Sequence, residues 1–386
     1  MAALRKLPSR SYFKNKRVLI RVDWNVSFDG KKIRDQFRIE RSLATIRYVA
    51  KTARSVLVVS HLGSPKPGDT TPSLAPAAQA ASRMLKERVY FLQGTLDEIR
   101  ASFAAVPKHA IACMENIRFY QGERENSPAL AKTLASFVDV VIDDAFAEAH
   151  RSVASTVGIA RYLPHFSGLL MQEELKRLDV LKTKQKYPFV VVLGGAKLET
   201  KLPLVKKFLH EADAVLVGGG IANTFLAAGR LKVGSSLYEK QFLKQAKTMI
   251  DADTLFVPID FLVASSVNAK KAVVRVGDVD PKDRILDIGP ETKELYAQIL
   301  KRAKIVFWNG PMGYAENTIF AQGTKAVVAQ LKKNKTATVV IGGGDTLDAI
   351  DAALRAQKNV FVSTGGGAML YYLSGKKLPG IEVLKK

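Results

Sequence analysis

The hydrophobic positions of the chain fall in short runs that alternate with amphipathic segments. In the first half, five apolar runs are separated by helical patterns such as 40–53. A short apolar run is typical of a buried parallel strand, and an apolar position every three or four residues predicts a helix. The predicted strands are 17–26, 55–63, 88–92, 110–119 and 139–146. Strands that alternate with helices in this way predict a doubly wound α/β domain.

The second half repeats the pattern, but its strands run into clusters of glycine. The four examples are "VVVLGGAKLETKL" (190–202), "AVLVGGGIANTFL" (214–226), "VVIGGGDTLDAIDAAL" (339–354) and "VFVSTGGGAMLYYL" (360–373). The carboxyl ends of parallel strands meet at one edge of a sheet, where α/β folds bind ligands. Glycine lets a backbone approach a ligand closely, and the N–H groups at a helix start favour anions. One such turn is more often explained by tight packing, but four together predict a nucleotide site.

Two lysines follow the first of these glycine turns. Lys197 and Lys201 are four residues apart, so on a helix they would share one face. Two ammonium groups beside an anion site suit a polyphosphate. An ordinary exposed lysine pair is the alternative, and the neighbouring glycine turns favour the phosphate site.

A single helix is expected between the two halves. Met171, Leu175, Leu178 and Leu181 recur on one helical face, and "KTKQKYP" then ends the pattern. The predicted fold class is therefore α/β, with two doubly wound parallel-sheet domains joined by an interdomain helix. The expected limits are 1–170 for the N-terminal domain, 171–185 for the helix and hinge, and 186–373 for the C-terminal domain, with a tail at 374–386.

Composition limits the other possibilities. The chain of 386 residues is 47% hydrophobic and 25% charged, as expected for a globular protein of two domains. Its single cysteine, Cys113, excludes an intrachain disulfide and fits a reducing compartment. The amino terminus has no apolar core of a signal peptide, and no apolar run approaches the roughly 18 residues of a membrane span. We therefore expect a cytoplasmic protein.

The charge balance is strongly basic. The formal net charge is +23, which favours anionic partners such as nucleic acid, acidic lipid or phosphorylated metabolites. The basic residues are spread through short pairs, and no basic run is interleaved with aromatic residues. A generally basic surface explains the surplus at least as well as a specific role with nucleic acid.

The strand ends of the first half carry cations and polar groups instead of glycine. They are Asp23, Asn25, Arg38, His61, Arg118, His150 and Arg151. Guanidinium groups match the oxygens of carboxylates and phosphates. Any one of these arginines alone is best explained as a surface residue, and His61 alone as a core histidine. Because they follow successive strands, we expect one pocket for a small polyanion.

Ten blocks of the sequence together resemble the phosphoglycerate kinase family over essentially the whole chain. They are "RVDWNV", "IRDQFRI", "SHLGSP", "MENIRF", "DDAFAEAHR", "LGGAKLETK", "LDIGPET", "FWNGPMGYAE", "IGGGDT" and "STGGGA". The resemblance implies reversible phosphoryl transfer between 1,3-bisphosphoglycerate and Mg-ADP, giving 3-phosphoglycerate and Mg-ATP in glycolysis and gluconeogenesis. It also implies a monomer with Mg²⁺ as cofactor, whose partners are these small molecules and neither a membrane nor nucleic acid.

The resemblance assigns roles to individual residues. The residues expected at 3-phosphoglycerate are Asp23, Trp24, Asn25, Arg38, His61, Leu62, Gly63, Ser64, Arg118 and Arg151. Those expected at the nucleotide are Gly195, Lys197, Lys201, Gly219, Asn309, Glu316, Gly343, Gly344, Asp345 and Thr346. Arg38 and Lys197 are the expected catalytic residues, Glu316 is expected at the ribose, and Asp345 on the metal. The tail after "STGGGA" is expected to return to the N-terminal domain.

The implied mechanism is direct in-line transfer without a covalent enzyme intermediate. The protein positions the reactants and neutralises charge on the transferring group, for which Lys197, Arg38 and Mg²⁺ are the candidates. No general base is expected, because the acceptor carboxylate is already ionised. Because the two sets of residues belong to different domains, we expect the domains to close when both substrates are bound.

The chain departs from the family pattern at four positions. Ser64 stands where the family usually has arginine, and Val153 replaces a frequent histidine. Ser27 replaces proline, and Trp24 stands where phenylalanine is common. Ser64 removes one basic group from the substrate patch, which bears on affinity more than on the identity of the reaction.

Two other functions were weighed against this one. A dinucleotide oxidoreductase should carry G-x-G-x-x-G after an early strand and an acidic residue about 20 positions on, and the first half has no such pattern. A basic nucleic-acid-binding protein would bind random DNA tightly and lose that binding steeply with salt, which a salt titration would reveal.

Overall fold

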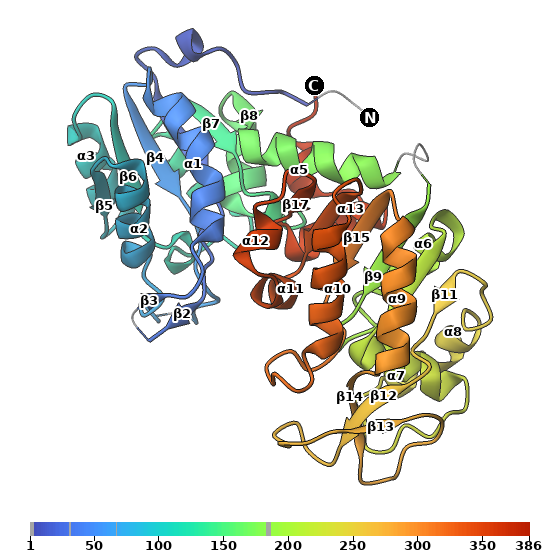
Figure 1. Ribbon diagram of the computed structural model, residues 1–386. Coiled ribbons are helices and arrows are strands. Elements are labelled where there is room, and N and C mark those ends of the chain that lie inside the picture. The colour runs from blue at the N-terminus through green and yellow to red at the C-terminus, as the bar shows by residue number, and fades with distance from the viewer. Residues whose placement is uncertain (1–3, 31, 67, 183–186) are drawn as a thin grey trace. The chain divides into compact units, whose positions relative to one another are not determined.

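The structure is a computed structural model that describes residues 4–30, 32–66, 68–182 and 187–386. The chain forms two compact units (Figure 1). Unit 1 comprises Met1–Lys176 and Lys376–Lys386, and unit 2 comprises Arg177–Gly375. Each unit contains one parallel sheet of six strands, which confirms the predicted α/β class. Among the described residues, no helix is both long and apolar enough to cross a membrane.

The sheet of unit 1 has the strand order β5-β6-β4-β1-β7-β8. Its strands are β1 (Arg17–Arg21), β4 (Ser55–Val59), β5 (Val89–Leu92), β6 (Ala110–Met114), β7 (Val140–Asp143) and β8 (His165–Ser167). β1 pairs in parallel with β4 on one side and with β7 on the other. Strands that follow β1 in the chain therefore lie on both sides of it. Such a reversal of strand order is where open α/β sheets bind ligands, at the carboxyl ends of the strands.

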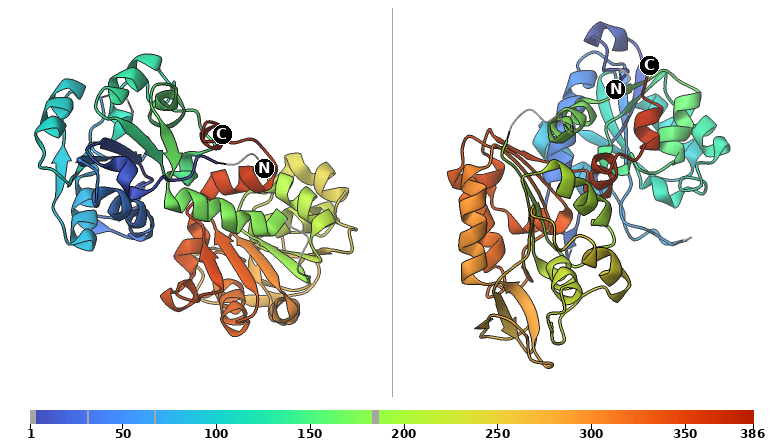
Figure 2. Two further views of the ribbon diagram at one scale, coloured as in Figure 1. Left: turned by 90° about the horizontal axis from the view of Figure 1, so that it is seen from above. Right: turned by 90° about the vertical axis from the view of Figure 1, so that its right-hand side faces the viewer.

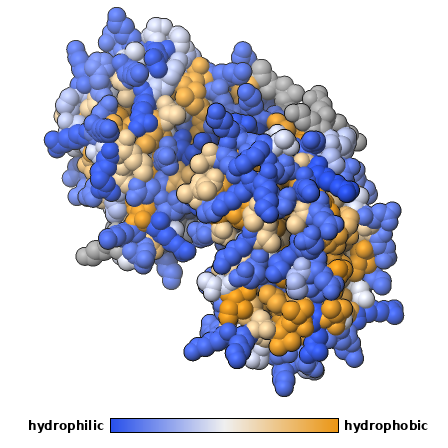
Figure 3. Space-filling model, viewed as in Figure 1, coloured by the Kyte–Doolittle hydropathy of each residue, from blue (hydrophilic) through white to orange (hydrophobic). Residues whose placement is uncertain are grey.

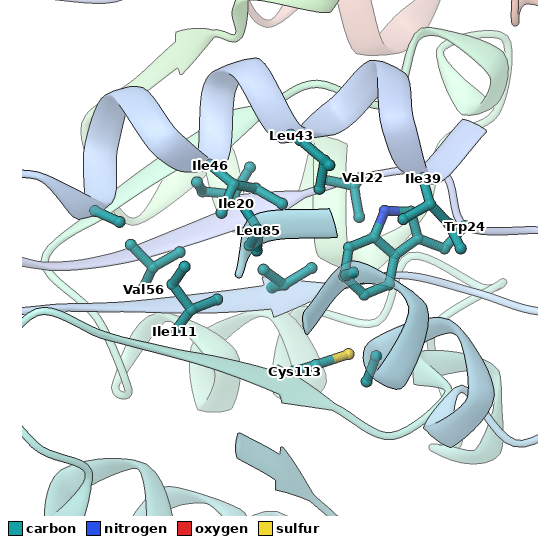
Figure 4. Close-up of a cluster of buried hydrophobic side chains, with 14 of the residues drawn as sticks. Ile20, Val22, Trp24, Ile39, Leu43, Ile46, Val56, Leu85, Ile111 and Cys113 are labelled. Atoms are coloured by element: carbon teal, nitrogen blue, oxygen red, sulfur yellow. The ribbon is translucent and has the colours of Figure 1, made fainter. Parts of the chain in front are cut away.

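Helices cover both faces of this sheet, because successive residues of a strand point to opposite faces. On one face, β1 and β4 pack against α1 (Phe37–Ala50) and α2 (Ala75–Leu85), as Figure 4 shows. The labelled side chains of that cluster include Ile20, Val22, Trp24, Val56, Ile39, Leu43, Ile46 and Leu85. On the other face, Leu19 and Leu57 join α3 (Leu96–Ala105) and α4 (Pro128–Ala135). Burial on both faces explains why these strands show apolar runs rather than alternation.

The strands of unit 1 are shorter than predicted, and the difference positions functional residues. β1 ends at Arg21, so the predicted strand residues 22–26 form the loop that leaves the sheet. The predicted strand 110–119 splits into β6 and a 3₁₀ turn, Ile117–Phe119. The side chain of Asn116 accepts a hydrogen bond from the Arg118 N–H and so caps that turn. A small hairpin, β2 (Phe28–Asp29) with β3 (Lys32–Ile33), precedes α1.

The sheet of unit 2 has the strand order β11-β10-β9-β15-β16-β17. Its strands are β9 (Phe189–Leu193), β10 (Ala214–Val217), β11 (Leu255–Phe256), β15 (Ile305–Asn309), β16 (Thr338–Gly342) and β17 (Val360–Val362). All neighbouring pairs are parallel, so the carboxyl ends of β9, β10, β15, β16 and β17 meet at one edge. This confirms that the predicted glycine turns converge.

The helices of unit 2 lie on both faces of its sheet, as the views in Figure 2 show. They are α6 (Leu202–Glu211), α7 (Gly219–Ala228), α8 (Leu243–Lys247), α9 (Pro290–Arg302), α10 (Gln322–Lys333), α11 (Gly344–Ala349), α12 (Ala352–Arg355) and α13 (Gly366–Leu373). Phe208 of α6 packs edge-to-face on Phe189 of β9, with ring centroids 5.5 Å apart. On α9, the hydroxyl of Tyr296 donates to Val217 O or Phe256 O, each 2.8 Å away.

A three-stranded antiparallel sheet was not predicted from the sequence. It has the order β13-β12-β14, with β12 (Phe261–Ala264), β13 (Val273–Arg275) and β14 (Arg284–Ile288). Hydrophobic side chains gather on the surface over these strands (Figure 3). Val273, Val274 and Val276 are among the exposed ones. Unit 2 is thus a parallel sheet with an antiparallel addition rather than a purely parallel fold.

The chain passes from unit 1 to unit 2 through α5 (Leu169–Asp179) and the 3₁₀ turn Val180–Lys182. The four apolar residues predicted to share a helical face are all buried: Met171, Leu175, Leu178 and Leu181. The end of the predicted hinge, 183–185, and the first residue of the predicted C-terminal domain, 186, lie outside the described residues. The carboxyl-terminal tail belongs to unit 1, where α14 (Pro379–Glu382) donates from Gly380 N to Ala149 O over 2.9 Å.

Candidate active site

The loop after β1 holds an arginine in place through a buried carboxylate. Asp23 is 5% exposed, and its carboxylate is bound by the guanidinium of Arg38, the second residue of α1. Asp23 Oδ1 also accepts from the Asn25 N–H at 3.1 Å, which shapes the loop. The Arg38 side chain keeps a quarter of its surface exposed. Its guanidinium is therefore oriented by the protein and still accessible from solvent.

His61, which follows β4, is buried beside this pair. Its Nδ1 lies 3.3 Å from Arg21 Nη2 and 4.0 Å from Asp23 Oδ1. Burial, together with the positive charges of Arg21 and Arg118, holds the pKa of His61 well below its usual value, so the ring is neutral at neutral pH. A guanidinium can only donate, so Nδ1 accepts and the ring proton is on Nε2. That nitrogen lies 3.5 Å from Glu148 Oε1.

Glu148 links the remaining cations of this site. It ends the 3₁₀ turn Phe146–Glu148 that follows β7. Its Oε2 accepts from Arg118 Nη2 at 2.9 Å, and its Oε1 lies 3.5 Å from Arg151 Nη1. Arg118 also donates to the carbonyl oxygen of Gly63. The structure thus brings together three predicted arginines and the predicted histidine, and we call this set the anion patch: Arg38, His61, Arg118 and Arg151.

The segment after β4 is tied to the loop after β1. The amide of Gly63 donates to Asn25 Oδ1 at 2.9 Å, and Asn116 holds both main-chain groups of Leu62 at 3.1 and 2.8 Å. Ser64 follows as an exposed residue. The predicted binding segments 23–25 and 61–64 are therefore joined directly by a hydrogen bond.

Two predicted binding residues have side chains that belong to the core. Trp24 is fully buried, and its indole N–H donates to Ser42 Oγ at 2.9 Å. Leu62 is 3% exposed. Only the main chains of these two residues could contact a ligand in this conformation.

Unit 2 has a pocket at the carboxyl edge of its sheet, with a volume of about 400 Å³. Its apolar walls are Leu237, Val267, Ile285, Leu286, Pro311 and Tyr314. Its polar groups are Asn223, Arg284, Glu316 and Asp345, and its floor includes Gly195, Gly219, Gly220 and Gly313. An apolar slot with a few polar groups suits a flat heterocyclic base attached to a hydroxyl-bearing group. Four predicted nucleotide residues therefore lie in one pocket: Gly195, Gly219, Glu316 and Asp345.

At two positions on this edge, the backbone conformation and the surrounding atoms require glycine. Gly219 has φ +60°, and a Cβ there would lie 2.9 Å from Gly195 O. Gly343 has φ +101°, and a Cβ there would lie 2.8 Å from Asn309 Nδ2. A side chain would thus be strained and crowded at both positions. Gly344, the first residue of α11, has no atom within 4 Å of where its Cβ would be, so space is open beside its backbone.

The two predicted phosphate lysines differ in environment, and the expectation that they share a helical face is wrong. Helix α6 begins only at Leu202, and the turn before it is held by Glu239, which accepts from the amides of Leu198 and Glu199. Lys197 is exposed. Lys201 instead donates to Gly194 O and lies 3.3 Å from Asn309 O. Burial lowers the pKa of Lys201 to about 8, and the negative charge of Asp345 opposes that change.

Two further predicted residues, Thr346 and Asn309, form hydrogen bonds with the main chain of the protein. The Thr346 hydroxyl accepts from Gly310 N at 2.6 Å and donates to Gly342 O at 3.0 Å. The Asn309 amide donates to the same carbonyl oxygen at 2.8 Å. These bonds fix the loop after β15 to the loop after β16. Both residues therefore shape the phosphate edge of the sheet.

Asp345 is the predicted metal ligand at this edge of the sheet. Among the described residues, no three His, Cys, Asp or Glu side chains are grouped so that they could hold a metal ion. Asp345 is exposed at the pocket. A single carboxylate fits Mg²⁺ that arrives on a nucleotide, because Mg²⁺ keeps water and phosphate ligands and needs few from the protein.

Several site residues were missed in the sequence. Glu148 lay inside a quoted block, and a carboxylate among cations was the available signal. Arg21 was visible only as an arginine in an apolar strand, and it is fully buried beside His61. Tyr314 also lay inside a quoted block, whereas Leu237, another apolar pocket wall, lay in none and had no signal.

Comparison with known proteins is consistent along the whole chain. The family model described as "Phosphoglycerate kinase" matches residues 9–376. A phosphoglycerate kinase of Herpetosiphon aurantiacus is 42% identical over 379 residues, which are 96% of each chain. The structure of phosphoglycerate kinase from Coxiella burnetii has a TM-score of 0.82 at 40% identity, and that from Pyrococcus horikoshii OT3 has 0.84 at 32% identity. Each of these structures covers 96% of this chain and is covered to 96%.

Proposed function

The chain belongs to the phosphoglycerate kinase family, and from that premise we propose which of its residues carry the reaction. The reaction is the glycolytic transfer of a phosphoryl group between 1,3-bisphosphoglycerate and ADP, which gives 3-phosphoglycerate and ATP. The enzyme is thus a phosphotransferase whose acceptor is a carboxyl group.

The anion patch of unit 1 binds 3-phosphoglycerate. One observation carries this assignment: Arg38, His61, Arg118 and Arg151 are joined by Asp23 and Glu148 at the carboxyl edge of the sheet. Guanidinium groups bind carboxylate and phosphate oxygens through charge-assisted hydrogen bonds. Asn25, Gly63 and Ser64 border the patch, and Trp24 and Leu62 contribute through their main chains.

The pocket of unit 2 binds the nucleotide. Its apolar walls suit the base, and Glu316 is positioned as an acceptor for the ribose hydroxyls. The phosphates bind along Gly195, Gly219 and the 343–346 loop, with Lys197 and Lys201 as their cations. Lys201 is held beside Gly194 O, while Lys197 is exposed and can follow the transferring group.

The residues carry out the transfer by position and charge. Arg38 and Lys197 neutralise negative charge on the oxygens of the phosphoryl group during its transfer. This charge is redistributed as the bond to the leaving oxygen breaks. The acceptor carboxylate of 3-phosphoglycerate is ionised at neutral pH and needs no general base. Asp345 would hold Mg²⁺, which when bound neutralises charge on the nucleotide phosphates.

Domain closure, oligomeric state and location remain predictions beside this assignment. We expect closure of the two domains when both substrates bind, which small-angle scattering with and without both ligands would measure. We expect a monomer, which sedimentation at working concentration would measure. We expect a cytoplasmic location, which fits the single, buried Cys113.

The assignment is tested by binding each substrate separately. Titration calorimetry should show that Arg118→Ala and Arg151→Ala weaken 3-phosphoglycerate and leave ADP unchanged. Glu316→Ala should weaken ADP and leave 3-phosphoglycerate unchanged. A coupled assay of ATP formed from 1,3-bisphosphoglycerate and ADP measures the activity itself. The proposal fails if the arginine variants bind 3-phosphoglycerate as the native chain does.

A further inference from the structure

A carboxylate lies at the centre of the anion patch. Glu148 is 2.9 Å from Arg118 Nη2, and its other oxygen is 3.5 Å from both His61 Nε2 and Arg151 Nη1. Three of the four patch residues therefore already face a negative group that the protein supplies. A site for an anionic substrate does not need such a group, and it repels the substrate.

The burial of these groups makes the contact hard to avoid. The exposed fractions of the side chains are 2% for His61, 5% for Arg118 and 7% for Glu148, whereas Arg151 is 49% exposed. The two terminal nitrogens of Arg118 already donate hydrogen bonds, Nη1 to Gly63 O and Nη2 to Glu148 Oε2. An incoming anion can thus reach Arg151 at once, but it reaches Arg118 and the Nε2–H of the neutral His61 only if Glu148 is displaced.

We propose that Glu148 is an internal counter-anion of the anion patch. On binding, 3-phosphoglycerate displaces the Glu148 carboxylate from the patch, and this competition lowers the affinity of the site for 3-phosphoglycerate. This inference rests on the proposed function of the patch. Without substrate, Glu148 compensates buried charge, which would be costly if left unpaired. With substrate, the phosphate carries a charge of about −1.5 to −2 and three acceptor oxygens, so it replaces one carboxylate favourably.

A second feature of the chain acts in the same direction. Ser64, at the border of the patch, has no charge where the resembling family usually has arginine. A patch with one cation fewer and one internal carboxylate is closer to neutral than its three arginines indicate. Glu148 thus sets affinity through the charge it contributes, not through contact with the reacting atoms.

The test is the Glu148→Gln variant, which keeps the shape of the side chain and removes its charge. Titration calorimetry without nucleotide should give a Kd for 3-phosphoglycerate about tenfold lower than that of the native chain. Glu173→Gln is the matched control, because Glu173 also pairs with an arginine, Arg41, at 2.9 Å, in the same unit. It removes the same charge away from the patch and should leave the Kd unchanged.

Two further variants, Glu148→Asp and Arg118→Ala, complete the test. If thermal melting shows that Glu148→Gln does not fold, Glu148→Asp withdraws the carboxylate by one methylene and should tighten binding by a smaller factor. Unchanged or weaker binding in the folded Glu148 variants overturns the inference and leaves Glu148 as a residue that only positions Arg118. Arg118→Ala distinguishes failure of the inference about Glu148 from failure of the proposed function. If Arg118→Ala does not weaken the binding of 3-phosphoglycerate, the assignment of the anion patch to this substrate has failed instead.

Discussion

Arg38 is held by the carboxylate of Asp23, and the two residues come from different elements of unit 1. Asp23 lies in the loop after β1 and is 5% exposed, whereas Arg38 lies in the first turn of α1 with a side chain 25% exposed. The buried partner fixes the direction of the guanidinium without covering it. Such an arrangement preorganises a positive charge for a group that becomes more negative during a reaction.

Arg38→Ala should therefore lower kcat by about 10²–10³-fold, since a well-placed electrostatic group is worth on the order of 3–4 kcal/mol. It should also weaken 3-phosphoglycerate, and it should cost about 1–3 kcal/mol of unfolding free energy, because Asp23 loses its partner. Steady-state kinetics and denaturant unfolding measure the two effects. Arg41→Ala, one turn further along α1, is the control and should retain turnover. Unchanged kinetics for Arg38→Ala would exclude the catalytic role.

Lys197→Ala should lower kcat far more than it raises KM for ADP. The exposed ammonium is free to follow the transferring group, so its charge matters most in the transition state, at about 10²–10³-fold in rate. The measurement is kcat and KM at saturating 3-phosphoglycerate or 1,3-bisphosphoglycerate. A variant that keeps most of its turnover removes Lys197 from the catalytic residues.

ADP binding should be accompanied by proton uptake near pH 8 to 9. The pKa of Lys201 is about 8 in the free protein, because burial disfavours the ammonium. Phosphate oxygens favour the charged form and raise that pKa, so the amine takes up a proton when the nucleotide binds. Calorimetry in two buffers of different ionisation enthalpy measures the number of protons. Lys201→Met should abolish the uptake, and equal heats in both buffers for the native chain would contradict the prediction.

Ser64→Arg should lower KM for 3-phosphoglycerate on the order of tenfold, or about 1.4 kcal/mol. The new guanidinium would border the patch beside His61, and charge-assisted bonds are roughly twice as strong as those of a hydroxyl. KM for the nucleotide, which binds to the other unit, should hardly change.

Other bases near Ser64 offer the competing explanation. Lys66 is exposed two residues on, and Arg124 Nη2 donates to Pro65 O at 3.2 Å. If Ser64→Arg changes nothing while Lys66→Ala or Arg124→Ala weakens 3-phosphoglycerate alone, these bases already replace the missing charge. Both Michaelis constants should be measured at low and moderate salt.

Leu384→Ala should destabilise unit 1 by about 2–5 kcal/mol, the usual cost of removing a buried leucine side chain. Leu384 is fully buried, and its carbonyl oxygen accepts from Arg5 N at 2.8 Å, so the tail is part of this unit's structure. Thermal or denaturant unfolding measures the loss. Lys386→Ala, an exposed neighbour, should leave stability unchanged.

The sequence by itself determined the fold class and the chemistry of each sheet edge. Hydrophobic period and glycine placement are local properties, and parallel strands bring their carboxyl ends to one edge whatever the details of packing. For this reason Arg38, His61, Arg118 and Arg151 could be expected together, although they are far apart in the chain. The buried face of α5 was predicted for the same local reason.

Only the tertiary structure decided how those residues are used. Lys197 and Lys201 are alike in sequence, but Lys197 is exposed, whereas Lys201 is half-buried against main-chain oxygens from two strand ends. Trp24 is a core residue because its indole packs among side chains of α1 such as Ile39 and Leu43 and donates to Ser42 Oγ. The central place of Glu148 depends on the segments after β4, β6 and β7, which bring two arginines and a neutral histidine around one carboxylate. Burial, pairing and pKa depend on neighbours that folding brings from distant parts of the chain, and no local pattern records them.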